Sequence, residues 1–234
     1  MDLISQIVER AKSNKQRIVL PEGTEERTLK AANQVLTDGV ADLILLGNPS
    51  EIMDLAREWG LGNISRATII DPENHPKQEE YAQLLCQLRQ KKGMTIEEAR
   101  KLVRNPLYLG CLIIKAGDAD GMVSGACHST ADTLRPCLQI LKTKPGTKLV
   151  SAFFLMVVPD CEYGDDGVFV FGDCGLNQNP NPEELAAIAE SSAESYRMLT
   201  GNEPRVAMLS HSSKGSAKHA DVDKVVEATR IAKE

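Results

Sequence analysis

Short apolar runs alternate with longer amphipathic stretches along most of this chain. Runs rich in aliphatic and β-branched residues, typical of buried strands, occur at 17–20, 41–46, 67–70, 121–124, 148–158, 168–171 and 205–209. Stretches with helical periodicity occur at 24–38, 50–59, 78–92, 95–104, 106–116, 130–141, 182–199 and from 221 onward. Repetition of strand, turn and helix is typical of parallel sheets flanked by helices, so the pattern predicts an α/β fold.

Local signals mark several helix ends. Thr24 is the expected N-cap of the first of these helices, and Gly39 is expected to end it. Pro182, followed by two glutamates, suits the first turn of the helix at 182–199, because proline fixes a helical φ and carboxylates favour the positive end of the helix dipole.

The loop at 142–147 is the best candidate for a domain boundary, since it combines lysines with Pro145 and Gly146. We therefore predict a first α/β lobe at 1–144 and a second at 145–234. The second lobe has few predicted strands for an independent sheet. The last predicted helix reaches Glu234 with no strand after it. We expect the second lobe to be partial and the chain to be incomplete relative to its fold.

Composition narrows the class of protein. Hydrophobic residues make up 42% and charged residues 26% of the 234 positions, and the formal net charge of −6 comes from interspersed acidic and basic residues. This distribution argues against a nucleic-acid partner. The N-terminus lacks the basic and apolar regions of a signal peptide, and no apolar run approaches the length of a membrane span. We expect a cytoplasmic protein without a membrane partner.

The cysteines and histidines give no metal signature. The six cysteines are widely spaced, and no C-x-x-C pair occurs. Free thiols and no metal are therefore expected. His128 and His211 lie in loops that follow predicted strands, but neither has the spacing of a metal pair or a catalytic triad.

Unusual residues follow several predicted strands, where ligands bind in open parallel sheets. After the strand at 121–124, Ser129 and Thr130 begin a predicted helix that carries Arg135. Backbone N–H groups, two hydroxyls and a guanidinium suit a phosphoryl group. An ordinary N-cap, with Arg135 paired to a surface carboxylate, explains the same residues, and the sequence leaves both interpretations open.

Other strand ends carry weaker signals. The turn at Ser213, Lys214 and Gly215 looks like a phosphate cradle but lacks the spacing of a nucleotide P-loop. Asp173 could orient a ligand or cap a turn, and Glu22 could bind a ligand or cap a helix. Cys161 has a more polar setting than the other cysteines and could face a cleft.

At these loops the sequence resembles the phosphate acetyltransferases and the related phosphate butyryltransferases, along essentially its whole length. The matching blocks are 18–23, 118–126, 128–136, 151–154, 157–164, 207–210 and 213–218. The block at 128–136, His-Ser-Thr-Ala-Asp-Thr-Leu-Arg-Pro, places the acetyl-specific enzymes closer than the butyryl-specific ones.

The resemblance implies two α/β lobes with the active-site cleft between them, in a homodimer. It implies coenzyme A and acetyl phosphate as substrates, with no separate cofactor. By position, Arg135 matches an arginine implicated in binding coenzyme A or phosphate, Arg89 matches another implicated in binding coenzyme A, and Cys161 matches a cysteine near the active site. The remaining expected cleft-lining contacts are Ser129, Thr130, Ser213, Lys214 and Gly215.

The sequence departs from the family pattern at its end. The family's C-terminal N-D-L-S-R-G segment holds an aspartate thought to deprotonate the thiol, together with a serine and an arginine, and this sequence ends before that segment. The catalytic residues are therefore expected beyond residue 234, and we expect weak ligand binding with little turnover. If the chain does turn over, Asp132, Asp173 and Glu22 are the first candidates for the base. The alternatives are a phosphate butyryltransferase or a non-catalytic module that binds coenzyme A or phosphate.

Overall fold

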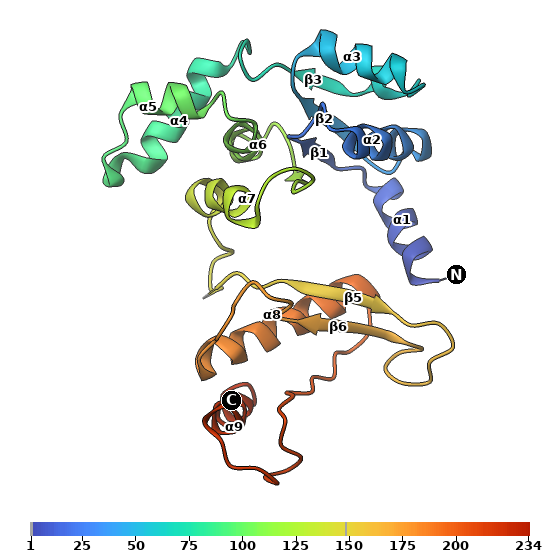
Figure 1. Cartoon of the computed structure of the whole chain (residues 1–234), viewed down its shortest axis with the longest axis vertical. Helices are drawn as coiled ribbons and strands as arrows, with labels where there is room; N and C mark the ends of the chain where they lie inside the picture. The colour runs from blue at the N-terminus through green and yellow to red at the C-terminus, as the bar shows by residue number, and fades with distance from the viewer. Residues whose placement is uncertain (1, 148) are drawn as a thin grey trace. The chain divides into compact units, whose positions relative to one another are not determined.

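The computed structural model describes residues 2–147 and 149–234. The chain separates into two compact units, Met1–Lys142 and Thr143–Glu234 (Figure 1). The assignment of 1–144 and 145–234 as the two lobes of one enzyme stays a prediction.

The first unit has a parallel sheet covered by helices on both faces. Its elements are α1 (Leu3–Ser13), β1 (Arg17–Leu20), α2 (Glu26–Asp38), β2 (Asp42–Leu46), α3 (Pro49–Glu58), the 3₁₀ turn η1 (Ile64–Arg66), β3 (Thr68–Ile70), α4 (Gln78–Arg89), the 3₁₀ turn η2 (Gln90–Lys92), α5 (Ile96–Leu102), α6 (Pro106–Lys115), β4 (Gly121–Met122), α7 (Thr130–Pro136) and the π-helical turn η3 (Cys137–Leu141). The strand order is β3-β2-β1-β4, and every pair is parallel. The predicted α/β fold with a parallel sheet is confirmed here.

Alternating side chains of β2 divide the core of the first unit into two layers. Leu43 and Leu45 pack with buried residues of α2 and α3, whereas Ile44 and Leu46 pack with buried residues of α4 to α6. Figure 1 shows these two groups of helices on opposite sides of the strands. A strand buried on both faces reads as a continuous apolar run, which explains why β2 was readable from the sequence.

Two local features differ from the sequence predictions. The N-cap of α2 is Glu25, whose carboxylate accepts from the backbone N–H of Thr28, so the prediction of Thr24 was wrong by one residue. The helix α1 was not predicted. Its signal was present, because Asp2 caps it and apolar residues recur with helical spacing at Ile4, Ile7, Val8 and Ala11.

The second unit contains β5 (Phe153–Val157), β6 (Val168–Gly172), α8 (Pro182–Thr200) and α9 (Ala220–Ile231). The strands β5 and β6 pair antiparallel, so the expectation of a parallel-type sheet is wrong for this pair. The reason is the short connection: antiparallel neighbours need only a tight loop, whereas a parallel crossover needs a dozen or more residues, usually with a helix. The helix α8 packs against β6 and α9.

Two predicted strands of the second unit are shorter or unpaired. The strand predicted at 148–158 begins at position 148, which lies outside the described residues, and only Phe153–Val157 pairs. The segment 205–209 forms no strand in the structure, although its run of apolar residues is typical of a buried strand. No helix of the described residues is long and apolar enough to cross a membrane.

Candidate functional site

A hydrogen-bonded polar cluster of the first unit lies where β1 and β4 end. The chain leaves β1 toward α2, which packs on one face of the sheet, and leaves β4 toward α7 and η3, which pack on the other. Two neighbouring parallel strands whose connections leave in opposite directions form a topological switch point. A crevice outside the carboxyl ends of such strands is the usual ligand site of open α/β sheets.

Glu22 follows β1 and binds the loop that follows β4. Its Oε2 accepts from the backbone N–H of Gly125 at 3.0 Å and of Ala126 at 2.8 Å, and its Oε1 accepts from the N–H of Cys127 at 2.9 Å. Nδ1 of His128 lies 2.7 Å from the same Oε1. The side chain of Glu22 is only 2% exposed. Burial alone would raise the pKa of Glu22, but the bonds from Cys127, His128 and Ala126 lower it to about 2.

This network corrects two expectations for Glu22. The side chain does not cap α2, because Glu25 does so. An ionised carboxylate with a pKa of about 2, whose oxygens already accept several hydrogen bonds, is a poor base for a thiol. Glu22 therefore holds the loop at 125–128 against the end of β1.

The ionised carboxylate fixes the tautomer of His128. Because a carboxylate can only accept, Nδ1 must carry the hydrogen that it shares with Glu22. The histidine side chain is 32% exposed. No hydrogen bond from the described residues reaches its Nε2. Sequence reasoning placed His128 in a candidate loop but missed this pairing.

Glu22, Cys127 and His128 bring a carboxylate, a thiol and an imidazole within 4.8 Å of one another. The cluster is not a good metal site, because both oxygens of Glu22 already accept from backbone N–H groups. It is not a cysteine triad either. Burial and the hydrogen bond to Glu22 raise the pKa of Cys127, and its sulfur lies beside Nδ1, the ring nitrogen that Glu22 already occupies.

Arg27 of α2 also binds the loop at 125–128. Its Nη2 donates to the carbonyl oxygen of Ala126 at 2.6 Å, and its Nε donates to Glu25 at 2.6 Å. Sequence reasoning did not single out Arg27, because its loop partner is 99 residues away along the chain.

The residues expected to contact phosphate continue from this loop. Ser129 is the N-cap of α7, since its Oγ accepts from the backbone N–H of Asp132. Thr130 is the first residue of that helix, and both it and Ser129 are exposed. Arg135 lies 3.9 Å from Asp132, and its side chain is 59% exposed. The local contacts are those of a capped helix with a weak surface ion pair, and they leave the guanidinium of Arg135 free for a further partner.

Arg89 ends α4, apart from these residues in the sequence. Its Nε is buried, and no described residue bonds it. A buried donor without a partner costs free energy, so this atom is a candidate for a ligand contact.

The remaining candidates belong to the second unit. Cys161 is half-buried and follows β5, with its sulfur 3.9 Å from the carbonyl oxygen of Tyr163. Ser213, Lys214 and Gly215 form an exposed turn in which Lys214 and Gly215 have φ of 50° and 84°. The N–H of Ser213 donates to the hydroxyl of Ser216.

Asp173, expected to orient a ligand or cap a turn, does the latter. Its carboxylate accepts from the N–H groups of Ala152, Gly175 and Leu176 and from the side chain of Asn177. Burial opposes ionisation, but the bonds from Asn177 and Leu176 lead those that lower the pKa of Asp173. This carboxylate is, like Glu22, a poor base.

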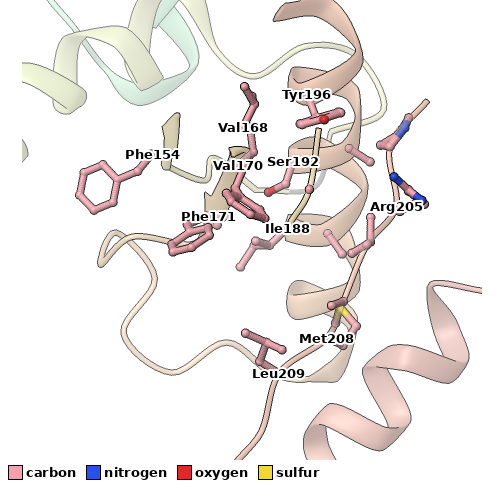
Figure 2. Close-up of a pocket in the computed structure, with 18 of the residues that line it drawn as sticks. Phe154, Val168, Val170, Phe171, Ile188, Ser192, Tyr196, Arg205, Met208 and Leu209 are labelled. Atoms are coloured by element: carbon pink, nitrogen blue, oxygen red, sulfur yellow. The ribbon is translucent and has the colours of Figure 1, made fainter. Parts of the chain in front are cut away.

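The second unit also contains a large hollow of about 960 Å³ between β6, α8 and the segment 204–209. Figure 2 shows Val170 and Phe171 of β6 and Ile188 of α8 facing it, with Arg205, Met208 and Leu209 on the opposite side. The hollow lies between 204–209 and β6, and in the described part of the chain 204–209 pairs with no strand. Its apolar walls are broken by polar side chains such as Ser192 and Tyr196.

Comparison with known proteins gives a consistent result over the whole chain. The family model described as "Phosphate acetyl/butaryl transferase" matches residues 2–234. A phosphate acetyltransferase of Thermoanaerobacterium thermosaccharolyticum is 57% identical over 233 residues, and one of Acetivibrio thermocellus is 53% identical over 234 residues. Each comparison covers 100% of this chain and 70% of the relative.

Solved structures agree with the sequence comparison. A phosphotransacetylase from Staphylococcus aureus superposes with a TM-score of 0.88 at 41% identity, over 99% of this chain and 68% of that one. A phosphotransacetylase from Streptococcus pyogenes superposes with a TM-score of 0.90 at 40% identity, over 98% of this chain and 68% of that one.

Proposed function

The chain belongs to the phosphate acetyl/butaryl transferase family, and we propose that it acts in the transfer of an acetyl group between acetyl phosphate and coenzyme A. The observation that carries the proposal is the match of residues 2–234 to the family, together with relatives above 50% identity that are named phosphate acetyltransferases. Acetyl rather than butyryl is the proposed group, because these relatives carry that name.

The reaction makes coenzyme A a substrate, and the proposal requires no bound cofactor. The thiolate sulfur attacks the acetyl carbonyl, the carbon–oxygen bond to phosphate breaks, and phosphate leaves. A thiol with a pKa of about 8.5 is mostly protonated at neutral pH, so its deprotonation is part of the barrier. Cationic groups and N–H donors lower the remaining part of the activation barrier, because they stabilise negative charge on the phosphate and on the carbonyl oxygen.

We assign substrate binding to residues of both units. In the first unit, the exposed guanidinium of Arg135 and the hydroxyls of Ser129 and Thr130 are proposed to contact phosphate or coenzyme A. The buried, unpartnered Nε of Arg89 supports a contact with coenzyme A. In the second unit, the proposed contacts are Cys161, Ser213, Lys214 and Gly215.

A homodimer and a cytoplasmic location complete the proposal. The homodimer comes from the family resemblance, and the cytoplasmic location is the expectation drawn from the sequence. Light scattering of the purified protein at several concentrations tests the dimer, because a dimer's mass is twice the 25.5 kDa of the chain.

Thioester formation from acetyl phosphate and coenzyme A tests the function. Butyryl phosphate is the matched acyl donor, and the acetyl donor is expected to give the larger kcat/KM. Because the chain spans 70% of the length of its relatives, the assay needs two forms, the 234-residue chain and a form extended with the remaining segment of a relative. Absence of thioester from both forms contradicts the proposal.

A further inference from the structure

His128 and Glu22 form a carboxylate–imidazole pair to which neither the sequence nor the family comparison assigns a role. We propose that Nε2 of His128 contacts the phosphate group and exchanges a proton with its reacting oxygen, with Glu22 as the positioning residue. The proposal rests on the proposed function, since it names the substrate group that His128 contacts.

The first support is the way in which Glu22 holds the imidazole. The buried carboxylate lies 2.7 Å from Nδ1 and is itself fixed by three backbone N–H groups. A general base whose second nitrogen is bound by a carboxylate is the arrangement of Ser-His-Asp triads, where the carboxylate sets the tautomer and stabilises the imidazolium. The ring here is therefore oriented, and Nε2 is the nitrogen left for a ligand.

The second support is the position of the ring. His128 is partly exposed at the carboxyl ends of β1 and β4, on the loop that leads directly into Ser129 and Thr130. A ligand that binds at the carboxyl ends of these strands and contacts the two hydroxyls would lie close to His128.

The chemistry favours phosphate over the thiol as the proton partner. Imidazoles exchange protons near neutral pH, whereas a thiol ionises near 8.5, so proton transfer from the thiol is uphill. The oxygen that departs from acetyl phosphate dianion is much more basic than imidazole, so transfer of a proton to it from protonated Nε2 is downhill. Cleavage of acetyl phosphate dianion at its carbon–oxygen bond would also release a trianion unless the departing oxygen receives a proton.

The proton balance is complete in both directions. Toward the thioester, the sulfur–carbon bond forms, the carbon–oxygen bond breaks, and the departing oxygen takes the proton of Nε2 to give HPO₄²⁻. The thiol proton passes to solvent, from which Nε2 is protonated again. Toward acetyl phosphate, Nε2 takes the proton of HPO₄²⁻ as its oxygen attacks the thioester carbonyl, and the sulfur leaves as a thiolate.

Titratable and charged groups near the ring come from three segments and must be accounted for in a pH experiment. They are Glu22 after β1, Cys127 of the loop itself, and Glu25 with Arg27 at the start of α2. Arg27 does not bond the ring, since its contacts are to Ala126 and Glu25.

Ring nitrogen NMR with ¹⁵N-labelled histidine gives a test that does not need turnover. The sequence has only four histidines, and His75, which stacks on Tyr81, serves as the internal control. We expect inorganic phosphate to move the Nε2 signal of His128 toward its protonated value and to leave the His75 signals unchanged. Phosphate that does not bind, or that binds without moving Nε2 of His128, overturns the proposal.

Two substitutions then separate proton exchange from structure. In His128→Asn the amide nitrogen can replace Nδ1 and keep the bond to Glu22, but nothing replaces Nε2. We expect kcat of the thioester-forming protein to fall about 100-fold with a flattened pH profile, the usual scale of general acid–base catalysis. In His75→Asn we expect no change. If His128→Asn keeps wild-type kcat while His128→Gln, which loses the Nδ1 position, is impaired, the ring is only structural and the proposal is wrong.

The two proposals fail in different ways. If neither the 234-residue chain nor the extended form makes thioester, but phosphate still shifts the Nε2 signal, the proposed function is wrong and the phosphate contact of His128 stands. If thioester forms and His128→Asn does not slow it, the role of His128 is wrong and the proposed function stands.

Discussion

Oε1 of Glu22 lies 2.7 Å from Nδ1 of His128, although 106 residues separate the two in the chain. The contact exists because β1 and β4 are neighbours in the parallel sheet, which brings the loops after both strands to the same edge. Glu22 also accepts hydrogen bonds from three backbone N–H groups of the loop after β4. One buried carboxylate therefore holds the segment that leads to Ser129 and Arg135.

Replacement of Glu22 by glutamine is expected to destabilise the protein by about 2–3 kcal/mol. The amide keeps the shape of the carboxylate but places an N–H₂ group against buried N–H donors, which leaves hydrogen bonds unmade. The matched control is Glu26→Gln at the start of α2, because Glu26 is exposed and among the described residues pairs only with Lys30, a contact worth about 0–1 kcal/mol. Denaturant unfolding of the three proteins measures the difference, and equal losses for the two variants would contradict the structural role of Glu22.

The free energy of unfolding should also depend on pH through the carboxylate of Glu22. The pKa of Glu22 is about 2 in the folded protein, below its ordinary value of 4.5. The stabilisation, about 3 kcal/mol, is therefore complete above pH 4.5 and is lost as the pH falls toward 2. Unfolding free energies measured across this range should show a smaller acid dependence in Glu22→Gln than in the wild type. An identical acid dependence in both would show that Glu22 titrates normally.

Gly23 is expected to tolerate no side chain. A Cβ atom there would lie 2.4 Å from the backbone oxygen of Leu46, and backbone cannot move aside as a flexible side chain can. Gly23→Ala should cost about 1–3 kcal/mol. Gly62→Ala is the control, since no atom lies within 4 Å of its added Cβ, and it should be neutral or stabilising by up to about 1 kcal/mol. Thermal and denaturant unfolding decide between these values, and a harmless Gly23→Ala would contradict the close approach of β2.

Arg135→Ala should affect ligand binding much more than stability. The ion pair with Asp132 is long and exposed, so its loss should change the free energy of unfolding by less than about 0.5 kcal/mol. A charge-assisted bond to phosphate or coenzyme A is worth about 1.5–3 kcal/mol, so Kd should rise on the order of 10- to 100-fold.

Arg57→Ala is the matched control for Arg135→Ala. Arg57 is also exposed and also pairs with an aspartate three residues earlier, at 2.9 Å. Calorimetric titration with coenzyme A and with inorganic phosphate should distinguish the two variants. Binding that is unchanged in Arg135→Ala would exclude that arginine from the site.

The first unit was most predictable from the sequence at β2, the strand that is buried on both faces. The strand β2 reads as an uninterrupted apolar run, and glycine and proline mark the turns around it. Ser129 and Arg135 could be located for the same reason, since they follow a recognisable strand and begin a recognisable helix. The pairing of Glu22 with His128 could not be predicted, because it depends on which strands are neighbours in the sheet.

The second unit was less predictable for a different reason. Residues 205–209 have strand character, but a strand is defined by a neighbour, and a hollow separates this segment from β6. The direction of β6 relative to β5 could have been predicted, because the pattern leaves only 159–167 between the two predicted strands, too few residues for a parallel crossover.

Thioester formation from acetyl phosphate and coenzyme A tests the central claim most directly, on protein whose intact mass is verified. We predict saturable binding of coenzyme A to the 234-residue chain, and acetyl-CoA formation by the form extended with a relative's remaining segment. No thioester from the extended form would contradict acetyl transfer. Rapid turnover by the 234 residues alone would place the thiol base within this chain.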